Sequence, residues 1–428
     1  MKTVSRFIIN TVSNKRNNSM KTVSRFIINT GKFFLVLLSV MVCGRTLGVS
    51  VEQRLIQDRV AINTLDFPIG IFSAGHPTDD NFSYIKRLGF DYIHKYGLAE
   101  HDTQKVQNYM DMAEKHRLKV MLDVSGPLTR LAKGEITEKE AIENFTMLIK
   151  RWKDHAALGF WYIYDEPSYP GMPPERLMAF HKIVKMETPD IPDAIALAWV
   201  KHWWDWTKCA DIIMPDYYPV RDAEFPISML NHQSEFFSKI SKKCDYMVPI
   251  VQCFGFPKYP NETELRYIMF STLPQKTRGL FFWSYWRSRI VPLKNGELKP
   301  DYLETKLKPI LAEFKQFIKL IKPAHKVLLV PNLEQKMYSS KQIMVGIWKM
   351  EKKMYIVMIN SWPEAREISF PLSPHIINAE LKPIFSTRSI SNLKVINGNL
   401  KLRVLPWETF IWETPVISVE TIKTKSKI

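Results

Sequence analysis

The sequence has few cysteines and lacks several short motifs that identify common enzyme classes. Four cysteines in 428 residues are too few for a disulfide framework. The 16 glycines form no phosphate-binding loop, and the chain contains neither a His-x-x-x-His pair nor a serine nucleophile elbow. These absences argue against a nucleotide-binding P-loop, a zinc protease of the usual type and an α/β-hydrolase.

The chain also lacks a dense cluster of positive charge, although its formal net charge is +17. Residues 1–50 contain eight Lys and Arg and no acid, so about half of the excess charge lies in this one segment. The remaining excess is dispersed, apart from a short basic tail at residues 416–428. Nucleic-acid binding requires a basic patch or a recognisable motif. We therefore expect no nucleic-acid partner.

The first fifty residues have the pattern of a leader. The segment Met-Lys-Thr-Val-Ser-Arg-Phe-Ile-Ile-Asn-Thr at residues 1–11 recurs at 20–30, which indicates a duplicated leader or a true start at Met20. An uncharged apolar run at 33–42 and then small residues follow, as in a secretory signal peptide. We expect a secreted or periplasmic protein without further membrane insertion. An uncleaved signal anchor is the alternative, although a span needs roughly 20 apolar residues.

Three cysteines follow the leader, at positions 209, 244 and 253. Cys209 and Cys244 each precede a predicted strand, and the two strands would be neighbours in the sheet. One disulfide between them and free buried cysteines are the two alternatives.

From residue 67 onward, short apolar runs alternate with longer amphipathic segments, which favours βα units and a parallel sheet. The expected strands are residues 67–74, 90–96, 118–124, 159–164, 194–200, 211–217, 248–254 and 279–285. The expected helices include residues 102–117, 138–153, 174–187, 235–241, 262–275 and 301–321. Eight strands over about 250 residues predict an α/β fold, a closed (β/α)8 TIM barrel, which we assign to residues 51–324.

A second domain of alternating short strands follows the barrel. Its predicted strands include residues 343–348, 354–360, 367–370 and 400–405. The pattern predicts a C-terminal antiparallel β-sandwich at 325–415. It contains no group of chemically reactive residues, so we expect it to be a lid or brace for the barrel, with carbohydrate binding as the alternative.

The fourth predicted barrel strand ends in two acids. Residues 159–167 read Gly-Phe-Trp-Tyr-Ile-Tyr-Asp-Glu-Pro, and in a TIM barrel the loops after the strands build the active site. A carboxylic acid surrounded by Tyr and Trp rings has a raised pKa and can donate a proton. Asp165 and Glu166 are therefore catalytic candidates. The structural alternative is that they cap the next helix or pair with basic residues.

Other strand ends supply further candidates. Strand alternation places Tyr162, Tyr164 and Glu166 toward the barrel axis if Trp161 and Ile163 face the helices. Asp216 is a third catalytic candidate. The candidate substrate-binding residues are Asp123, Tyr164, Trp199, Tyr218, Gln252, Phe254 and Trp283. An aromatic cluster at 202–206 favours packing over a sugar platform.

Four segments, taken together, resemble the glycoside-hydrolase-type TIM barrels over about residues 66–320. They are Asp-Glu-Pro at 165–167, Met-Pro-Asp-Tyr-Tyr-Pro at 214–219, Val-Pro-Ile-Val-Gln-Cys-Phe-Gly at 248–255 and Gly-Leu-Phe-Phe-Trp-Ser at 279–284. In the large clan of retaining β-glycosidases, strand four ends in Asn-Glu-Pro and strand seven presents a nucleophilic Glu. The resemblance implies that Glu166 is the general acid/base. The sequence differs from the pattern in having Asp165 for the Asn and Gln252 for the nucleophile.

Glutamine cannot act as a carboxylate nucleophile, which leaves three alternatives. In the first, the chain resembles hexosaminidases with an adjacent Asp-Glu pair, in which Asp165 would orient a substrate acetamido group and Glu166 would protonate the leaving group. In the second, Asp216 is base or nucleophile opposite Glu166. In the third, the barrel binds carbohydrate without catalysis. Gln252 would bind sugar hydroxyls or support a neighbouring strand end as a buried amide.

A metal-dependent polysaccharide lyase or hydrolase is a further alternative. Asp123, Asp165, Asp216 and His94 would all lie at the barrel mouth, and these are possible metal ligands. The favoured prediction needs no cofactor. It is a glycoside hydrolase that acts on a glycan or oligosaccharide, with Glu166 as general acid/base.

Overall fold

The computed structural model describes ten stretches of the chain. They are residues 67–169, 171–198, 203–220, 228–255, 258–275, 277–285, 301–322, 343–372, 376–385 and 392–415. The predicted leader, the basic tail and Trp199 lie outside these stretches. Within them, no helix is both long enough and apolar enough to cross a membrane.

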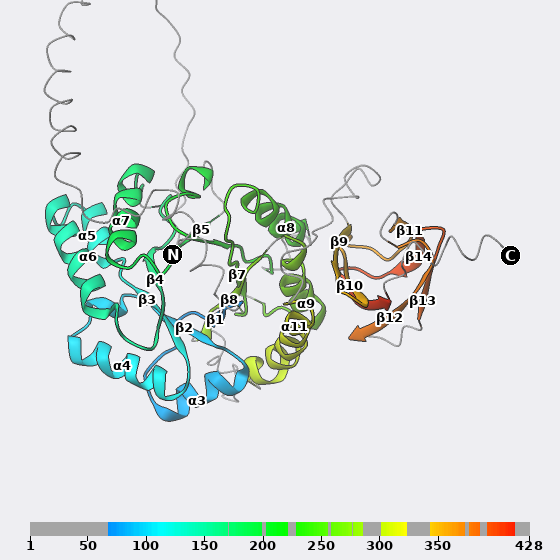
Figure 1. Ribbon diagram of the computed structural model, residues 1–428, viewed down its shortest axis with the longest axis horizontal. Helices are drawn as coiled ribbons and strands as arrows, with labels where there is room; N and C mark the ends of the chain where they lie inside the picture. The colour runs from blue at the N-terminus through cyan, green and yellow to red at the C-terminus, as the bar shows by residue number, and fades with distance from the viewer. Residues whose placement is uncertain are drawn as a thin grey trace, which may run out of the picture. The chain divides into compact units, whose positions relative to one another are not determined.

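Eight parallel strands form a closed barrel, as the sequence predicts (Figure 1). They are β1 (Ile69–Ile71), β2 (Tyr92–Lys95), β3 (Lys119–Asp123), β4 (Leu158–Tyr164), β5 (Asp193–Ala198), β6 (Ile212–Asp216), β7 (Ile250–Gln252) and β8 (Leu280–Trp283). Each strand pairs with the next along the chain, and β8 pairs with β1. The (β/α)8 barrel is therefore confirmed, and its strands end at the same mouth.

Helices surround the ring of strands in Figure 1. They are α3 (Asp79–Leu88), α4 (Thr103–Lys115), α5 (Gly126–Ala132), α6 (Glu138–Trp152), α7 (Pro174–Glu187), α8 (Ser228–Ile240), α9 (Glu262–Phe270) and α11 (Lys308–Ile321). The predicted helix set did not include α3 and α5. Capping explains two of the starts, because Thr137 begins α6 and Asn261 begins α9, each in a capping box. Between β5 and β6 the described residues contain one helix, the short 3-10 helix η2 (Trp203–Trp206).

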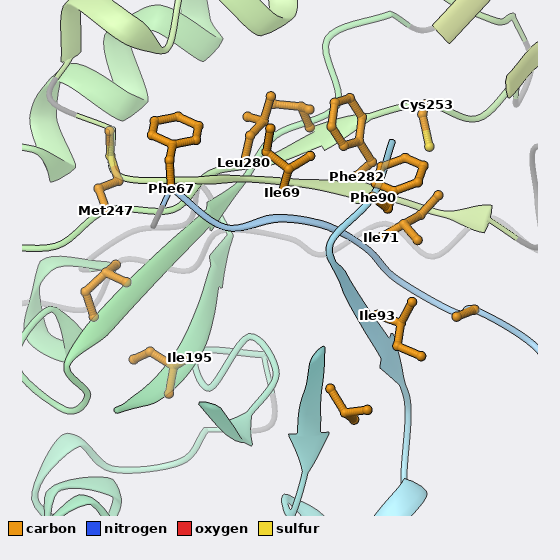
Figure 2. Close-up of a cluster of buried hydrophobic side chains, with 14 of the residues drawn as sticks. Phe67, Ile69, Ile71, Phe90, Ile93, Ile195, Met247, Cys253, Leu280 and Phe282 are labelled. Atoms are coloured by element: carbon orange, nitrogen blue, oxygen red, sulfur yellow. The ribbon is translucent and has the colours of Figure 1, made fainter. Parts of the chain in front are cut away.

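Strand alternation divides the barrel core into an inner and an outer layer. Ile69 and Ile71 of β1 belong to the large cluster that includes the helices, whereas the inner cluster includes Phe281. Figure 2 shows the buried side chains of the large cluster around β1, with Phe67, Phe90 and Phe282 among those labelled. Gly70 faces the axis, because an added Cβ there would lie 2.2 Å from the Phe281 ring. Side chains therefore fill the barrel interior.

Seven antiparallel strands follow the barrel, as the fold prediction required. They are β9 (Ile343–Lys349), β10 (Lys353–Asn360), β11 (Arg366–Pro371), β12 (Ala379–Phe385), β13 (Leu393–Ile396), β14 (Asn399–Val404) and β15 (Thr409–Pro415). Their order in the sheet is β11-β14-β13-β12-β15-β10-β9. They share a hydrophobic cluster of their own, as in a sandwich. The predicted strands did not include β12, β13 and β15.

Side chains of the barrel and of the C-terminal sheet are in contact. The Tyr267 hydroxyl on α9 lies 2.8 Å from the Ser361 hydroxyl, and the Tyr267 ring packs edge-on against Trp407. Phe317 on α11 makes a similar contact with Trp348 on β9. These contacts agree with the expectation that the second domain braces the barrel.

Cys209 and Cys244 are free thiols, so the disulfide alternative for these two residues is wrong. Burial raises the pKa of each of these two thiols to about 12, which keeps them protonated at neutral pH. The Cys209 thiol also donates a hydrogen bond to the Pro174 carbonyl at 3.4 Å. Their role in the described structure is packing.

Candidate active site

The end of β4 is irregular, and this irregularity decides where its side chains point. The register against β5 shifts between Tyr162 and Tyr164. Tyr162 lies in the inner cluster, whereas Tyr164 packs in the outer cluster together with Ile163. The expectation that Tyr164 faces the axis is therefore wrong, because the register shift breaks the alternation. Glu166 then adopts a left-handed conformation with φ of 44°, which is uncommon for a residue with a side chain.

Asp165 is exposed to solvent although protein surrounds it. The Tyr162 hydroxyl donates a hydrogen bond to Asp165 Oδ1. Burial, together with the charges of Glu166 and Asp123, raises the pKa of Asp165 to about 7, although the Tyr162 hydrogen bond opposes the shift. The surrounding protein thus desolvates the Asp165 carboxyl group while solvent still reaches it. Asp165 is thus accessible to a substrate and titrates near neutral pH.

Asp216 and Glu166 form a close pair of carboxyl groups. Asp216 ends β6 and is 8% exposed, and among the residues that the structure describes its Oδ1 has no hydrogen-bond partner. Burial raises the pKa of Asp216 well above its ordinary value. A hydrogen bond with Glu166 and the charges of Glu166 and Asp165 raise it further. Asp216 therefore keeps a proton at neutral pH and can donate it in a hydrogen bond to Glu166, as in other carboxyl pairs that share one proton.

Asp123 holds two loops at the mouth. Its carboxylate accepts hydrogen bonds from the backbone N–H of Gly97 at 2.9 Å and of Ser125 at 2.8 Å. Burial opposes ionisation of Asp123, but its interaction with His94, followed by the hydrogen bonds from Ser125 and Gly97, outweighs this effect and lowers its pKa. Nε2 of the buried His94 lies 3.7 Å away, and burial lowers the pKa of His94, so the imidazole is neutral. Asp123 supports the loops after β2 and β3, and its oxygens already have partners.

Gln252 at the end of β7 supports a loop in the same way. Its amide oxygen accepts a hydrogen bond from Val220 N at 2.8 Å, and its amide nitrogen donates to Val220 O at 2.7 Å and to Phe254 O at 3.2 Å. The side chain is 0% exposed. Of the two alternatives for Gln252, this geometry favours the buried structural amide over a ligand for sugar hydroxyls.

Aromatic rings line one side of the mouth. Tyr218 stacks on Trp283 with ring centroids 5.4 Å apart, and Phe254 meets both rings edge-on at 5.3 Å and 4.8 Å. Trp283 and Tyr218 remain partly exposed. The predicted residues Tyr218, Phe254 and Trp283 therefore form one contiguous group, which we call the aromatic wall. Such rings can pack against the apolar face of a sugar.

Tyr96 is a site residue that the sequence prediction missed. It follows β2, is 40% exposed and packs edge-on against His94 at 4.6 Å. Burial raises its pKa, and the charge of Asp165 raises it further, which places Tyr96 near this carboxylate. The alternation of side chains along the predicted strand 90–96 could have identified Tyr96, because it lies two positions after His94.

The metal alternative receives no support from the grouping of ligand atoms. Within the described stretches, only two sets of three acids or histidines have ligand atoms within 4.8 Å of one another. They are Asp111, Glu114 and His155, and His181, Asp193 and Asp211. Neither set contains one of the four residues proposed for a metal at the barrel mouth.

Comparison with known proteins identifies the fold. No protein-family model matches the sequence, and a search of curated proteins also found no match. Among solved structures, an α-amylase from Geobacillus thermoleovorans complexed with acarbose has a TM-score of 0.51 at 12% identity, covering 82% of this chain and 98% of that one. Eubacterium rectale Amy13B has a TM-score of 0.54 at 11% identity, covering 82% of this chain and 95% of that one.

A third similar structure is isomaltulose synthase from Klebsiella sp. LX3. Its TM-score is 0.52 at 10% identity, and the match covers 82% of this chain and 99% of that one. At such low identity the likeness concerns the fold alone. It extends over nearly the whole of each of the three structures and includes both the barrel and the C-terminal sheet of this chain. The protein therefore shares with these structures the fold of a (β/α)8 TIM barrel with a C-terminal β domain.

Proposed function

We propose that the protein is a glycoside hydrolase that acts on a glycan or oligosaccharide, with Glu166 as the proton donor to the leaving oxygen. The observation that carries the proposal is the meeting of Asp165, Glu166 and Asp216 at the mouth of the barrel, beside the aromatic wall. The fold shared with carbohydrate-active proteins supports it. Acid chemistry beside stacked rings suits the cleavage of a glycosidic bond.

The pair of carboxyl groups suggests how Glu166 is prepared for this role. Asp216 is buried, and Glu166 is partly exposed at the mouth. A protonated Asp216 that hydrogen-bonds to Glu166 would orient the Glu166 carboxyl and provide it with a nearby proton. In the cleavage step Glu166 would take the Asp216 proton through this hydrogen bond and pass it to the leaving oxygen, and the water that completes the hydrolysis would return a proton to the pair.

The same contact argues against Asp216 as a carboxylate opposite Glu166. Catalytic carboxyl groups that flank a glycosidic bond lie roughly 5–5.5 Å apart in retaining enzymes and 6.5–9.5 Å apart in inverting ones. Two carboxyl groups that share a hydrogen bond are too close to have a sugar between them. Of the three predicted catalytic acids, all of which the structure describes, Asp165 is then the remaining one that a substrate can reach. This favours the alternative in which Asp165 orients a substrate acetamido group.

The test is a Glu166→Gln variant assayed on a panel of glycosides that includes 2-acetamido sugars, each with a good leaving group (4-nitrophenol) and with a poor one (methanol). General acid catalysis contributes about 10²–10⁴-fold, so turnover of a substrate with a poor leaving group should fall by at least about 100-fold at an unchanged melting temperature. Glu143→Gln on α6, whose side chain is 64% exposed, is the matched control. If wild-type protein binds oligosaccharide but cleaves no member of the panel, the non-catalytic alternative holds and the proposal fails.

We further propose that the protein is exported by its leader, residues 1–50. Mass spectrometry of the N-terminus after expression in the native host tests this proposal. A mature chain that still begins at Met1 or Met20 would exclude cleavage.

A further inference from the structure

We propose that Tyr169 and Trp204 are binding subsites for a glycan chain that extends from the barrel mouth over the loops after β4 and β5. This inference rests on the proposed function, because it takes the substrate to be carbohydrate. It adds that the substrate is a chain of several sugars and not a monosaccharide derivative, and it states over which side of the mouth the chain lies.

The first observation is where exposed aromatic rings occur. Among the described residues, three large aromatic side chains are highly exposed: Tyr96 at 40%, Tyr169 at 67% and Trp204 at 45%. Each lies in a segment that follows the carboxyl end of a barrel strand. The highly exposed apolar side chains of the outer helices are Met147 on α6 and Met186 on α7. Exposed aromatic rings thus gather on the face that carries the site, which is where a ligand would cover them.

The second observation is that the backbone of Tyr169 is tied to Glu166. The Tyr169 N–H donates a hydrogen bond to the Glu166 carbonyl at 3.1 Å, which closes a four-residue turn. The Met172 N–H donates to the Pro167 carbonyl at 2.9 Å. The proposed acid and the exposed ring therefore belong to one hydrogen-bonded turn, and a sugar chain that places its scissile bond at Glu166 passes close to Tyr169.

The third observation is that the segment carrying Trp204 is anchored to the same loop. The Trp206 ring N–H donates to the Met172 carbonyl at 2.9 Å, and Trp206 and Trp203 are buried. Trp203 packs edge-on against Phe236 at 5.6 Å and against Trp204 at 5.8 Å. Packing is therefore the role of the two flanking tryptophans, whereas Trp204 is held on a fixed turn with its side chain partly in solvent.

These rings suit a glycan better than a protein partner. A sugar presents an apolar C–H face that can lie on an aromatic ring while its hydroxyl groups stay in water. Tyr169 and Trp204 are separate rings at one edge of the mouth. They suit a glycan, because each of its sugar units presents an apolar face to which one ring can bind. A protein partner would need a contiguous apolar patch, and the rings of Trp203 and Trp206 that could extend one are buried.

The experiment compares a long and a short substrate in Tyr169→Ala, Trp204→Ala and the double variant. The short substrate is the best 4-nitrophenyl glycoside, and the long ones are chito-, malto-, cello- and xylohexaose. Loss of one stacked ring is worth about 1 kcal/mol, or about fivefold. We expect kcat/KM for the hexasaccharide to fall at least about fivefold more than kcat/KM for the aryl glycoside. Met186→Ala, at a position 73% exposed on α7, is the control and should change neither value.

Calorimetric titration of the same hexasaccharides separates this inference from the proposed function. If wild-type protein cleaves none of them, the proposed function fails. Weaker binding of a hexasaccharide by the two aromatic variants, but not by Met186→Ala, would still support the subsites. The inference is overturned if the aromatic variants bind as wild type does, if both substrates lose activity equally, or if wild-type protein binds no hexasaccharide.

Discussion

Gln252 permits a quantitative test of how the mouth is built. It stands where the resemblance to retaining β-glycosidases would place a nucleophilic Glu, so Gln252→Glu introduces the expected acid. In the structure its amide nitrogen donates to the carbonyls of Val220 and Phe254. A carboxylate there would face two carbonyl oxygens in a site that is 0% exposed. We expect the variant to be destabilised and to gain no activity.

The magnitude follows from the groups left without partners. A buried polar group that loses its partner costs about 1–3 kcal/mol, so Gln252→Leu, which removes the partners of the N–H and C=O of Val220, should lose about 2–6 kcal/mol. Gln252→Glu should lose about 1–3 kcal/mol at low pH, because a protonated carboxyl group can still accept from Val220 N–H and donate to one of the two carbonyls. Burial raises the folded-state pKa of the new acid, so the folded state binds the proton more tightly and stability falls as pH rises above about 4.3. The added loss is about 1.4 kcal/mol per unit of the shift.

The assay is urea unfolding of the three proteins at pH 5 and pH 7. Between these values Gln252→Glu should lose up to about 3 kcal/mol relative to wild type, whereas the difference between Gln252→Leu and wild type should not depend on pH. Gln104→Glu on α4, an exposed position, is the matched control and should change stability by less than about 0.5 kcal/mol. A Gln252→Glu variant as stable as wild type at pH 7, or one with higher activity, would refute the structural role of this amide.

Two further predictions concern the acids of the mouth. Because the pKa of Asp165 is raised from 3.8 to about 7, the folded state binds its proton more tightly. The melting temperature should therefore decline between these pH values in wild type, and the decline should be smaller in Asp165→Asn; parallel profiles would contradict the shift. Asp123 accepts hydrogen bonds from two backbone N–H groups, and Asp123→Asn would turn its amide N–H₂ toward one of these donors. It should cost about 1–3 kcal/mol in urea unfolding, and an unchanged midpoint would contradict that role.

The barrel could be predicted from the sequence because one pattern, an apolar run followed by an amphipathic segment, is repeated along the chain. Eight apolar runs separated by amphipathic segments leave few other folds, and errors at single boundaries do not change the count. The strands are shorter than expected, as in β7, which is residues Ile250–Gln252 against the predicted 248–254. The disulfide could not be decided from the sequence, since bridging depends on the distance and direction of two side chains.

The candidate site was predictable only where a residue type carries a chemical signal. Adjacent acids at a strand end are such a signal, and Asp165 and Glu166 do interact electrostatically with Asp216. A single tyrosine carries no such chemical signal, so the sequence prediction missed Tyr96. An amide is ambiguous by nature, because Gln252 can donate and accept with a sugar or with a backbone equally well. Only the position of the Val220 backbone favours one of these two roles.

The Tyr164 side chain does not face the barrel axis as expected, and the reason also explains how Asp165 and Glu166 both come to lie at the mouth. In a regular strand, successive side chains point to opposite faces, so Asp165 and Glu166 would point one toward the mouth and one toward the helices. The register shift before Tyr164 and the left-handed backbone of Glu166 break this alternation. As a result Asp165 lies within reach of the inward-facing Tyr162, and Glu166 also reaches the inward-facing Asp216.

The left-handed backbone of Glu166 has a cost in folding free energy, and the barrel fold by itself does not require this conformation. A residue with a side chain in an uncommon backbone region costs about 1–3 kcal/mol and persists where the surroundings enforce it, often at functional sites. Here the enforcing contacts are the turn from Glu166 to Tyr169 and the bond from Met172 to Pro167. A pair of acids that served only to cap α7 would not need such a backbone, because capping requires ordinary extended geometry, which the actual N-cap, Pro173, has. Capping therefore does not account for the backbone conformation of Glu166, whereas the proposed catalytic role of this residue would.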